Sequence, residues 1–144
     1  GAMDLLLIIR DAIASSLAGA LLTAVQARVT GQTVAVLLTQ EALEAAARGS
    51  FSWPRELSGP TIRLGIADRA AAQGLPLLGR GAGRQLDAKG LLSHAQRAGV
   101  ELYACPMWTT LLGLEESLPP ELRRLDGSAL IDLLRNAGQV VGSL

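Results

Sequence analysis

Short apolar runs alternate with longer amphipathic segments along the N-terminal third of the chain. Residues Leu5–Ile9 are all apolar, and residues 33–39 are nearly so. Such runs are typical of strands buried on both faces of a parallel sheet. The segment 12–25 between them has leucines and a valine at four-residue spacing, which predicts a helix capped by Ser15 or Ser16. Strand, helix and strand together predict a βαβ unit with parallel pairing.

The same alternation continues to the C-terminus. Helices are predicted over 40–48, capped by Thr39, and over 87–98, capped by Asp87. The segment 61–74 favours a helix, with a strand over 61–66 as the competing interpretation. A last helix capped by Ser128 and a closing strand over 139–144 follow a polar, proline-containing stretch. We therefore predict one domain over residues 4–144, an α/β fold with a doubly wound, mostly parallel sheet of four to five strands and helices on both faces.

The stretch from residue 99 to 108 combines a helix end, a strand and a helix start. Gly99 is suited to ending a helix, and the alternating residues 100–104 are typical of a strand. Pro106 ends the strand and is favoured at the first position of a helix. This pattern places Cys105 at the N-cap of a helix, at the carboxyl end of a strand where α/β sheets bind ligands.

Two interpretations of Cys105 follow. Free N–H groups and the helix dipole would point at its sulfur and favour a reactive thiolate. A lone cysteine is also often a small buried hydrophobic residue. In the same way, the neighbours Met107 and Trp108, which follow Pro106, either shield the sulfur from water or belong to the core of the next helix.

Two other features of the sequence are candidates for chemistry. Residues 79–84 (Gly-Arg-Gly-Ala-Gly-Arg) resemble a phosphate loop but lie mid-chain and lack the third glycine of a dinucleotide fingerprint. A flexible basic surface loop is the favoured interpretation, from which Arg80 or Arg84 reaches an anion at the carboxyl end of the sheet. His94 is the only histidine, and no second ligand is spaced to join it, so no metal site is predicted.

Composition narrows the function classes. Hydrophobic residues make up 49% of the 144 residues and charged ones only 18%, which predicts that apolar surface is covered by a partner or by further copies of the chain. The 13 basic and 13 acidic residues give a net charge of zero, so no nucleic-acid footprint is expected.

Further expectations concern the cell compartment. The single cysteine excludes an internal disulfide and is typical of a reducing compartment, so we expect a cytoplasmic protein. Arg10 and Asp11 interrupt the apolar run of residues 5–25, and neither half reaches the ~20 residues of a membrane span. No basic region precedes Leu5, so no signal peptide is expected. Residues 1–3 are typical of an expression-tag remnant.

The order of elements resembles the DsrE/DsrF-like family of small sulfur-metabolism proteins. The resemblance rests on residues 99–105 (Gly-Val-Glu-Leu-Tyr-Ala-Cys), on Leu-Gly-Leu at 112–114 and on the terminal segment 129–141. It implies a flavodoxin-like fold and a sulfur relay. Cys105 would carry sulfane sulfur as a persulfide and pass it to a thiol on a partner protein, often a small sulfur carrier, without a cofactor. It also implies a homo- or hetero-oligomer, commonly a trimer or hexamer.

The sequence is also compatible with other function classes. The chain lacks a second cysteine, so a mechanism with a resolving thiol is not expected, and whether the protein is a sulfurtransferase enzyme is undecided. The chain is alternatively a non-catalytic module that binds a nucleotide or another anion through Arg80, Arg84 or Arg10. A third interpretation is a structural oligomer subunit in which Cys105 is inert.

Overall fold

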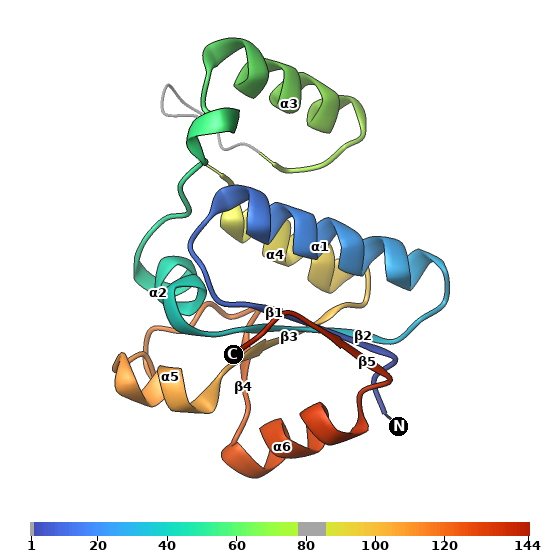
Figure 1. Ribbon diagram of the computed structural model, residues 1–144, viewed down its shortest axis with the longest axis vertical. Coiled ribbons are helices and arrows are strands. Elements are labelled where there is room, and N and C mark those ends of the chain that lie inside the picture. Colours follow the sequence, from blue (N-terminus) through green and yellow to red (C-terminus); the bar gives the residue numbers. More distant parts are fainter. Residues whose placement is uncertain (1, 78–85) are drawn as a thin grey trace.

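A five-stranded parallel sheet forms the centre of the protein (Figure 1). The computed structural model describes residues 2–77 and 86–144. The strands are ordered β4-β3-β2-β1-β5, and every neighbouring pair is parallel. Their bounds are β1 Leu5–Ile9, β2 Val34–Leu38, β3 Glu101–Ala104, β4 Arg123–Arg124 and β5 Gln139–Val141.

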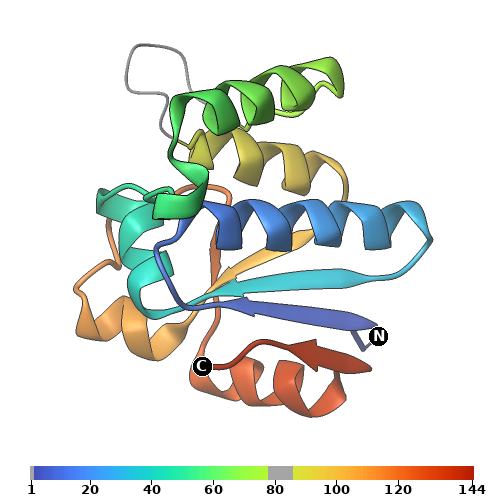
Figure 2. The same ribbon diagram turned by 45° about the horizontal axis from the view of Figure 1, so that its top comes forward.

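Helices cover both faces of this sheet, which confirms the predicted doubly wound α/β class (Figure 2). Helices α1 and α4 lie side by side on one face, α3 lies outside them, and α6 covers the opposite face. Helix α5 lies near the carboxyl edge of the sheet and contacts α2 and α6. The bounds are α1 Ala14–Val29, α2 Gln40–Arg48, α3 Pro60–Ala72, α4 Ala88–Arg97, α5 Pro106–Leu111 and α6 Gly127–Asn136, with a 3-10 turn at Arg55–Leu57.

The strands divide their side chains between two hydrophobic clusters. Along β2, Val34, Val36 and Leu38 pack with α1 and α4 on what we call the α1 face. Ala35 and Leu37 pack with α6 on the opposite side, the α6 face. Because β2 is buried on both sides, its continuous apolar sequence is explained by its central position in the sheet.

Two of the predicted helix caps are wrong. Helix α1 begins before the two serines, and Ile13 occupies its N-cap position. Asp11 organises this start instead, because its carboxylate accepts hydrogen bonds from the Ile13 N–H at 3.1 Å and from the Ser16 hydroxyl at 3.4 Å. At α6, Asp126 rather than Ser128 is the cap, and its side chain accepts from Ala129 N at 2.7 Å.

Other predictions are confirmed or fall outside the structure. Asp87 caps α4 and accepts from Gly90 N at 2.9 Å. Helix α3, Pro60–Ala72, covers most of the segment 61–74, so the competing strand is excluded. Residues 79–84, with Arg80 and Arg84, lie outside the described residues. Met3, which was predicted to belong to a tag remnant, accepts a backbone hydrogen bond from Gly138 at 2.8 Å and packs on the α6 face.

Across the described residues, no helix combines the length and the apolar content that crossing a bilayer requires.

Candidate functional site at the carboxyl edge of the sheet

Cys105 occupies the junction between β3 and α5 that the sequence predicted. Its backbone N–H donates to Leu38 O at 3.0 Å, so the pairing of β2 and β3 continues for one residue beyond the strand. Its carbonyl oxygen accepts from Thr109 N at 3.0 Å and from Thr109 Oγ1 at 2.7 Å. With Pro106 at the first helical position, Cys105 is the N-cap of α5. The backbone around the sulfur is therefore fixed from both sides.

The Cys105 side chain is buried. Only 1% of the residue is exposed, and its neighbours on the α6 face are apolar. The fully buried ones are Leu6, Ala35, Leu37 and Leu130. A reaction partner can therefore reach the sulfur only after α5 or α6 moves away from it.

The register of the sheet places Thr39 beside Cys105. Leu38 pairs with Ala104, so the residues that follow them, Thr39 and Cys105, occupy the next row. Both follow the alternation that directs Leu37 and Tyr103 to the α6 face. Thr39 is fully buried, and its Oγ1 has no hydrogen-bond partner. Thr39 is the N-cap residue of α2 as predicted, but its hydroxyl does not bond the helix.

The turn from β2 into α2 has an unusual backbone. Gln40 has φ 50°, the one positive value among the described residues other than glycine. A side chain in this left-handed region costs of order 1–3 kcal/mol and is most often found where function or packing holds it. Gln40 lines a cavity of about 370 Å³ together with Trp108, Glu41 and Glu44. Two carboxylates make this cavity a poor place for an anion.

Pro106, Met107 and Trp108 have different environments. Pro106 is buried, and 47% of Met107 is exposed. Trp108 is half-buried and packs against both hydrophobic clusters, which suits the interpretation that it belongs to the core. Met107 is not part of that core.

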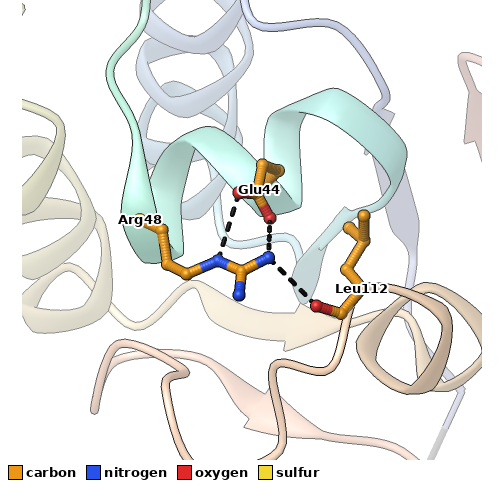
Figure 3. A network of polar contacts seen from close by, with 3 residues as sticks. All are labelled: Glu44, Arg48 and Leu112. Carbon is orange, nitrogen blue, oxygen red and sulfur yellow. Dashed lines mark hydrogen bonds and ion pairs between the residues drawn. The ribbon is translucent and has the colours of Figure 1, made fainter.

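An arginine on α2 joins that helix to the end of α5 (Figure 3). Arg48 donates to both carboxylate oxygens of Glu44, at 3.1 and 2.9 Å, and to Leu112 O at 3.0 Å. The hydrogen bond that Arg48 donates to Glu44 raises the pKa of Arg48 above its ordinary value. Because Leu112 is the C-cap of α5, this contact ties the helix that carries Cys105 to α2.

Sequence reasoning missed one basic residue at this edge. Arg124 lines a cavity of about 390 Å³ with Pro106 and the start of α6, and its Nη2 donates to Thr110 Oγ1 at 3.4 Å. The sequence carries no apolar pattern that would predict a strand here. Strand β4 has only two residues, both exposed arginines at the sheet edge, and they lie in a segment that was predicted to be a polar loop. Arg10 directly follows β1 and is exposed. Because Ile9 pairs with Leu38, Arg10 lies next to Thr39 at the carboxyl edge of the sheet.

Neither a histidine base nor a metal cluster adjoins Cys105 in the described part of the chain. His94 lies on α4, which packs on the α1 face, whereas Cys105 packs on the α6 face. No group of three or more histidine, cysteine, aspartate or glutamate side chains in the described residues is placed to hold a metal ion.

A second polar pair lies on the α6 face, nearer the start of β3. Tyr103 donates its hydroxyl to Glu101 Oε2 at 2.7 Å, beside a cavity of about 530 Å³ between β3 and α6. Burial and this hydrogen bond raise the pKa of Tyr103 to about 12. The neutral phenol is thus favoured in the folded protein.

This pKa predicts how stability depends on alkaline pH. The pKa is raised on folding, so its contribution to stability is fully present below pH 10 and is lost as the pH rises from 10 to about 12. Tyr103 is the only tyrosine, so phenolate absorbance should titrate with a single midpoint near 12. Glu101→Gln should lower that midpoint, and Tyr103→Phe should remove the signal. A midpoint near 10 in the wild-type protein would contradict the contact.

No model of a known protein family matches the sequence, and the comparison with curated proteins gives no match either.

Proposed function

We propose that the protein is a sulfur carrier that holds sulfane sulfur as a persulfide on Cys105 and delivers it to a thiol of a partner protein. The observation that carries this proposal is the position of the only thiol, at the carboxyl edge of a parallel sheet and at the N-cap of α5. The resemblance of residues 91–144 to the DsrE/DsrF-like family supports the same chemistry.

The transfer conserves atoms and electrons. The Cys105 thiolate attacks the outer sulfur of a donor persulfide, R–S–SH. The donor S–S bond breaks, a new S–S bond forms on Cys105, and the donor leaves as a thiolate. In the second step an acceptor thiolate attacks the outer sulfur, and Cys105 leaves as a thiolate. No metal, redox cofactor or second cysteine is needed for this exchange.

Both steps require that the donor or the acceptor reaches a sulfur that is buried in the folded protein. Helix α5 is only six residues long and carries exposed apolar side chains, Met107 and Leu111, the latter 70% exposed. A partner that docks on these side chains gains buried apolar area, which offsets the cost of moving α5 from Leu130. Between encounters the apolar cover keeps water from the persulfide.

The exposed apolar surface also supports assembly into a homo-oligomer. Val140 and Val141 on the edge strand β5 are 41% and 48% exposed, and Ile131 on α6 is 52% exposed. Edge strands with exposed apolar side chains are ready templates for pairing with another chain. A trimer or hexamer remains the oligomer that the family resemblance implies.

The test is to treat the wild-type protein with a small persulfide donor and to record its intact mass. We expect one added sulfur atom per chain, which is lost again when a protein with an accessible thiol is supplied. Because the sulfur is buried against α6, loading should be slow for the isolated protein and faster under mild denaturant. Protein that takes up no sulfur under either condition would rule out the carrier.

The burial of Cys105 favours one alternative, a structural subunit in which the thiol is inert. The apolar neighbours of the sulfur are those of a core residue, and they would need no chemistry to explain them. This alternative predicts no sulfur uptake together with a multimer mass by light scattering. The carrier predicts sulfur uptake whatever the oligomeric mass, so the two measurements separate the alternatives.

A further inference from the structure

We propose that Thr39 is the hydrogen-bond donor that stabilises negative charge on the Cys105 sulfur when sulfane sulfur is transferred. The inference rests on the proposed function for the transfer step, but donation to a Cys105 thiolate stands independently of it. Nothing in the sequence marked Thr39 for this role, because it was predicted only as a helix cap.

The register brings the two side chains together. Cys105 N donates to Leu38 O at 3.0 Å, and Thr39 N donates to Ile9 O at 3.0 Å, so both residues continue the parallel ladder beyond their strands. Neighbouring strands are ~4.8 Å apart, and paired residues of parallel strands direct their side chains to the same face. Thr39 and Cys105 therefore direct their side chains to the same face in the same row, with no hydrogen bond between them in this structure.

The hydroxyl of Thr39 makes no hydrogen bond in the structure. Thr39 is 0% exposed, and its Oγ1 has no hydrogen-bond partner, neither at the start of α2 nor on the Cys105 sulfur. Buried hydroxyls without partners are uncommon because each loses its hydrogen bonds to water. The other threonine near Cys105 differs, since Thr109 Oγ1 donates to the Cys105 carbonyl oxygen at 2.7 Å. The orphaned donor is thus Thr39.

A donor at this place acts in both halves of the exchange. It stabilises the attacking thiolate when sulfur is received. It also stabilises the thiolate that leaves when the acceptor removes the outer sulfur. Hydrogen bonds to charged groups are stronger than neutral ones, and here the surroundings are apolar. The side chains of Leu37 and Leu130 beside the sulfur are apolar, and His94 lies on a helix of the other face, so none of these three side chains competes as a donor.

The experiment compares Thr39→Val, which removes only the donor, with Thr39→Ser, which keeps it. The readouts are the far-ultraviolet thiolate absorbance of the single cysteine, the rate of sulfur loading from a small persulfide, and the melting temperature. We expect Thr39→Val to show less thiolate absorbance than the wild type at the same pH, and to load about ten- to a hundred-fold more slowly. Its melting temperature should be unchanged or higher, because an unsatisfied hydroxyl has been removed. Thr39→Ser should restore absorbance and rate.

Thr109→Val is the matched control for the loss of a buried hydroxyl near Cys105. It should lower the melting temperature and leave the thiolate absorbance as in the wild type, because Thr109 bonds the carbonyl oxygen and not the sulfur.

The outcomes separate this inference from the proposed function. Thiolate absorbance equal in wild type and Thr39→Val overturns the role of Thr39, whether or not sulfur is loaded. Absorbance that falls in Thr39→Val in a protein that takes up no sulfur supports the hydrogen bond and overturns the carrier. Loss of loading that Thr39→Ser does not rescue assigns Thr39 to packing and overturns the inference.

Discussion

Cys105→Ser is expected to abolish sulfur uptake completely, because Cys105 is the only thiol in the chain. The backbone contacts of Cys105 with Leu38 and Thr109 do not involve the sulfur, so they should persist in the variant. The new hydroxyl is nearly isosteric but lies among apolar side chains, which costs about 1–3 kcal/mol unless it finds a partner. The intact mass after treatment with a persulfide donor should show no added sulfur.

A second variant guards against a folding defect. Cys105→Ala places no polar group in the cluster and should also load no sulfur, and circular dichroism should show both variants folded. Sulfur found on either variant would mean that the wild-type mass gain arises elsewhere, and the assignment to Cys105 would fall.

Leu130→Ala should destabilise the protein by about 2–5 kcal/mol, a large part of the 5–15 kcal/mol that is typical of a domain. Leu130 is 1% exposed, and it is the fully buried side chain that α6 contributes to the cluster around Cys105. Its loss leaves a cavity on the α6 face. We therefore expect a lower midpoint in urea and a faster reaction of Cys105 with thiol reagents under native conditions.

The neighbouring residue provides the control. Ile131 lies on the same helix and is 52% exposed, so Ile131→Ala should change the free energy of unfolding by about 0.5 kcal/mol or less. Alkylation of Cys105 should proceed at the wild-type rate. If both variants react alike, or if Leu130→Ala leaves the thiol as unreactive as before, α6 is not what covers the sulfur.

The fold was predictable wherever one physical signal dominated. Strands β1 and β2 are apolar throughout because both of their faces are buried. A short continuous apolar run in the sequence predicts such a strand directly. Strand β4 was not predicted, because an edge strand of two exposed arginines has no apolar pattern. The capping errors have a similar origin: Asp11 and Asp126 organise their helices from positions just before the serines that the pattern favoured.

The site was predictable in position and not in environment. The order of Gly99, strand, Cys105 and Pro106 places the thiol at the start of α5, because each residue type has a strong local preference there. Burial under Leu130 depends on α6, which is remote in sequence, and no local pattern reports it. The placement of Thr39 next to Cys105 likewise depends on the register between β2 and β3, which sequence spacing alone does not determine.

The sheet order has a consequence for how the protein is made on the ribosome. Strands β1, β2, β3 and β4 lie in sequential order across the sheet, so each can pair with its predecessor as the chain lengthens. Strand β5 instead returns to pair with β1, and α6 precedes it in the chain. Contacts between such distant segments form late, since the loop they close is long. During synthesis the thiol therefore stays open to small molecules until α6 has emerged, and its cover closes after strands β1 to β3 have paired.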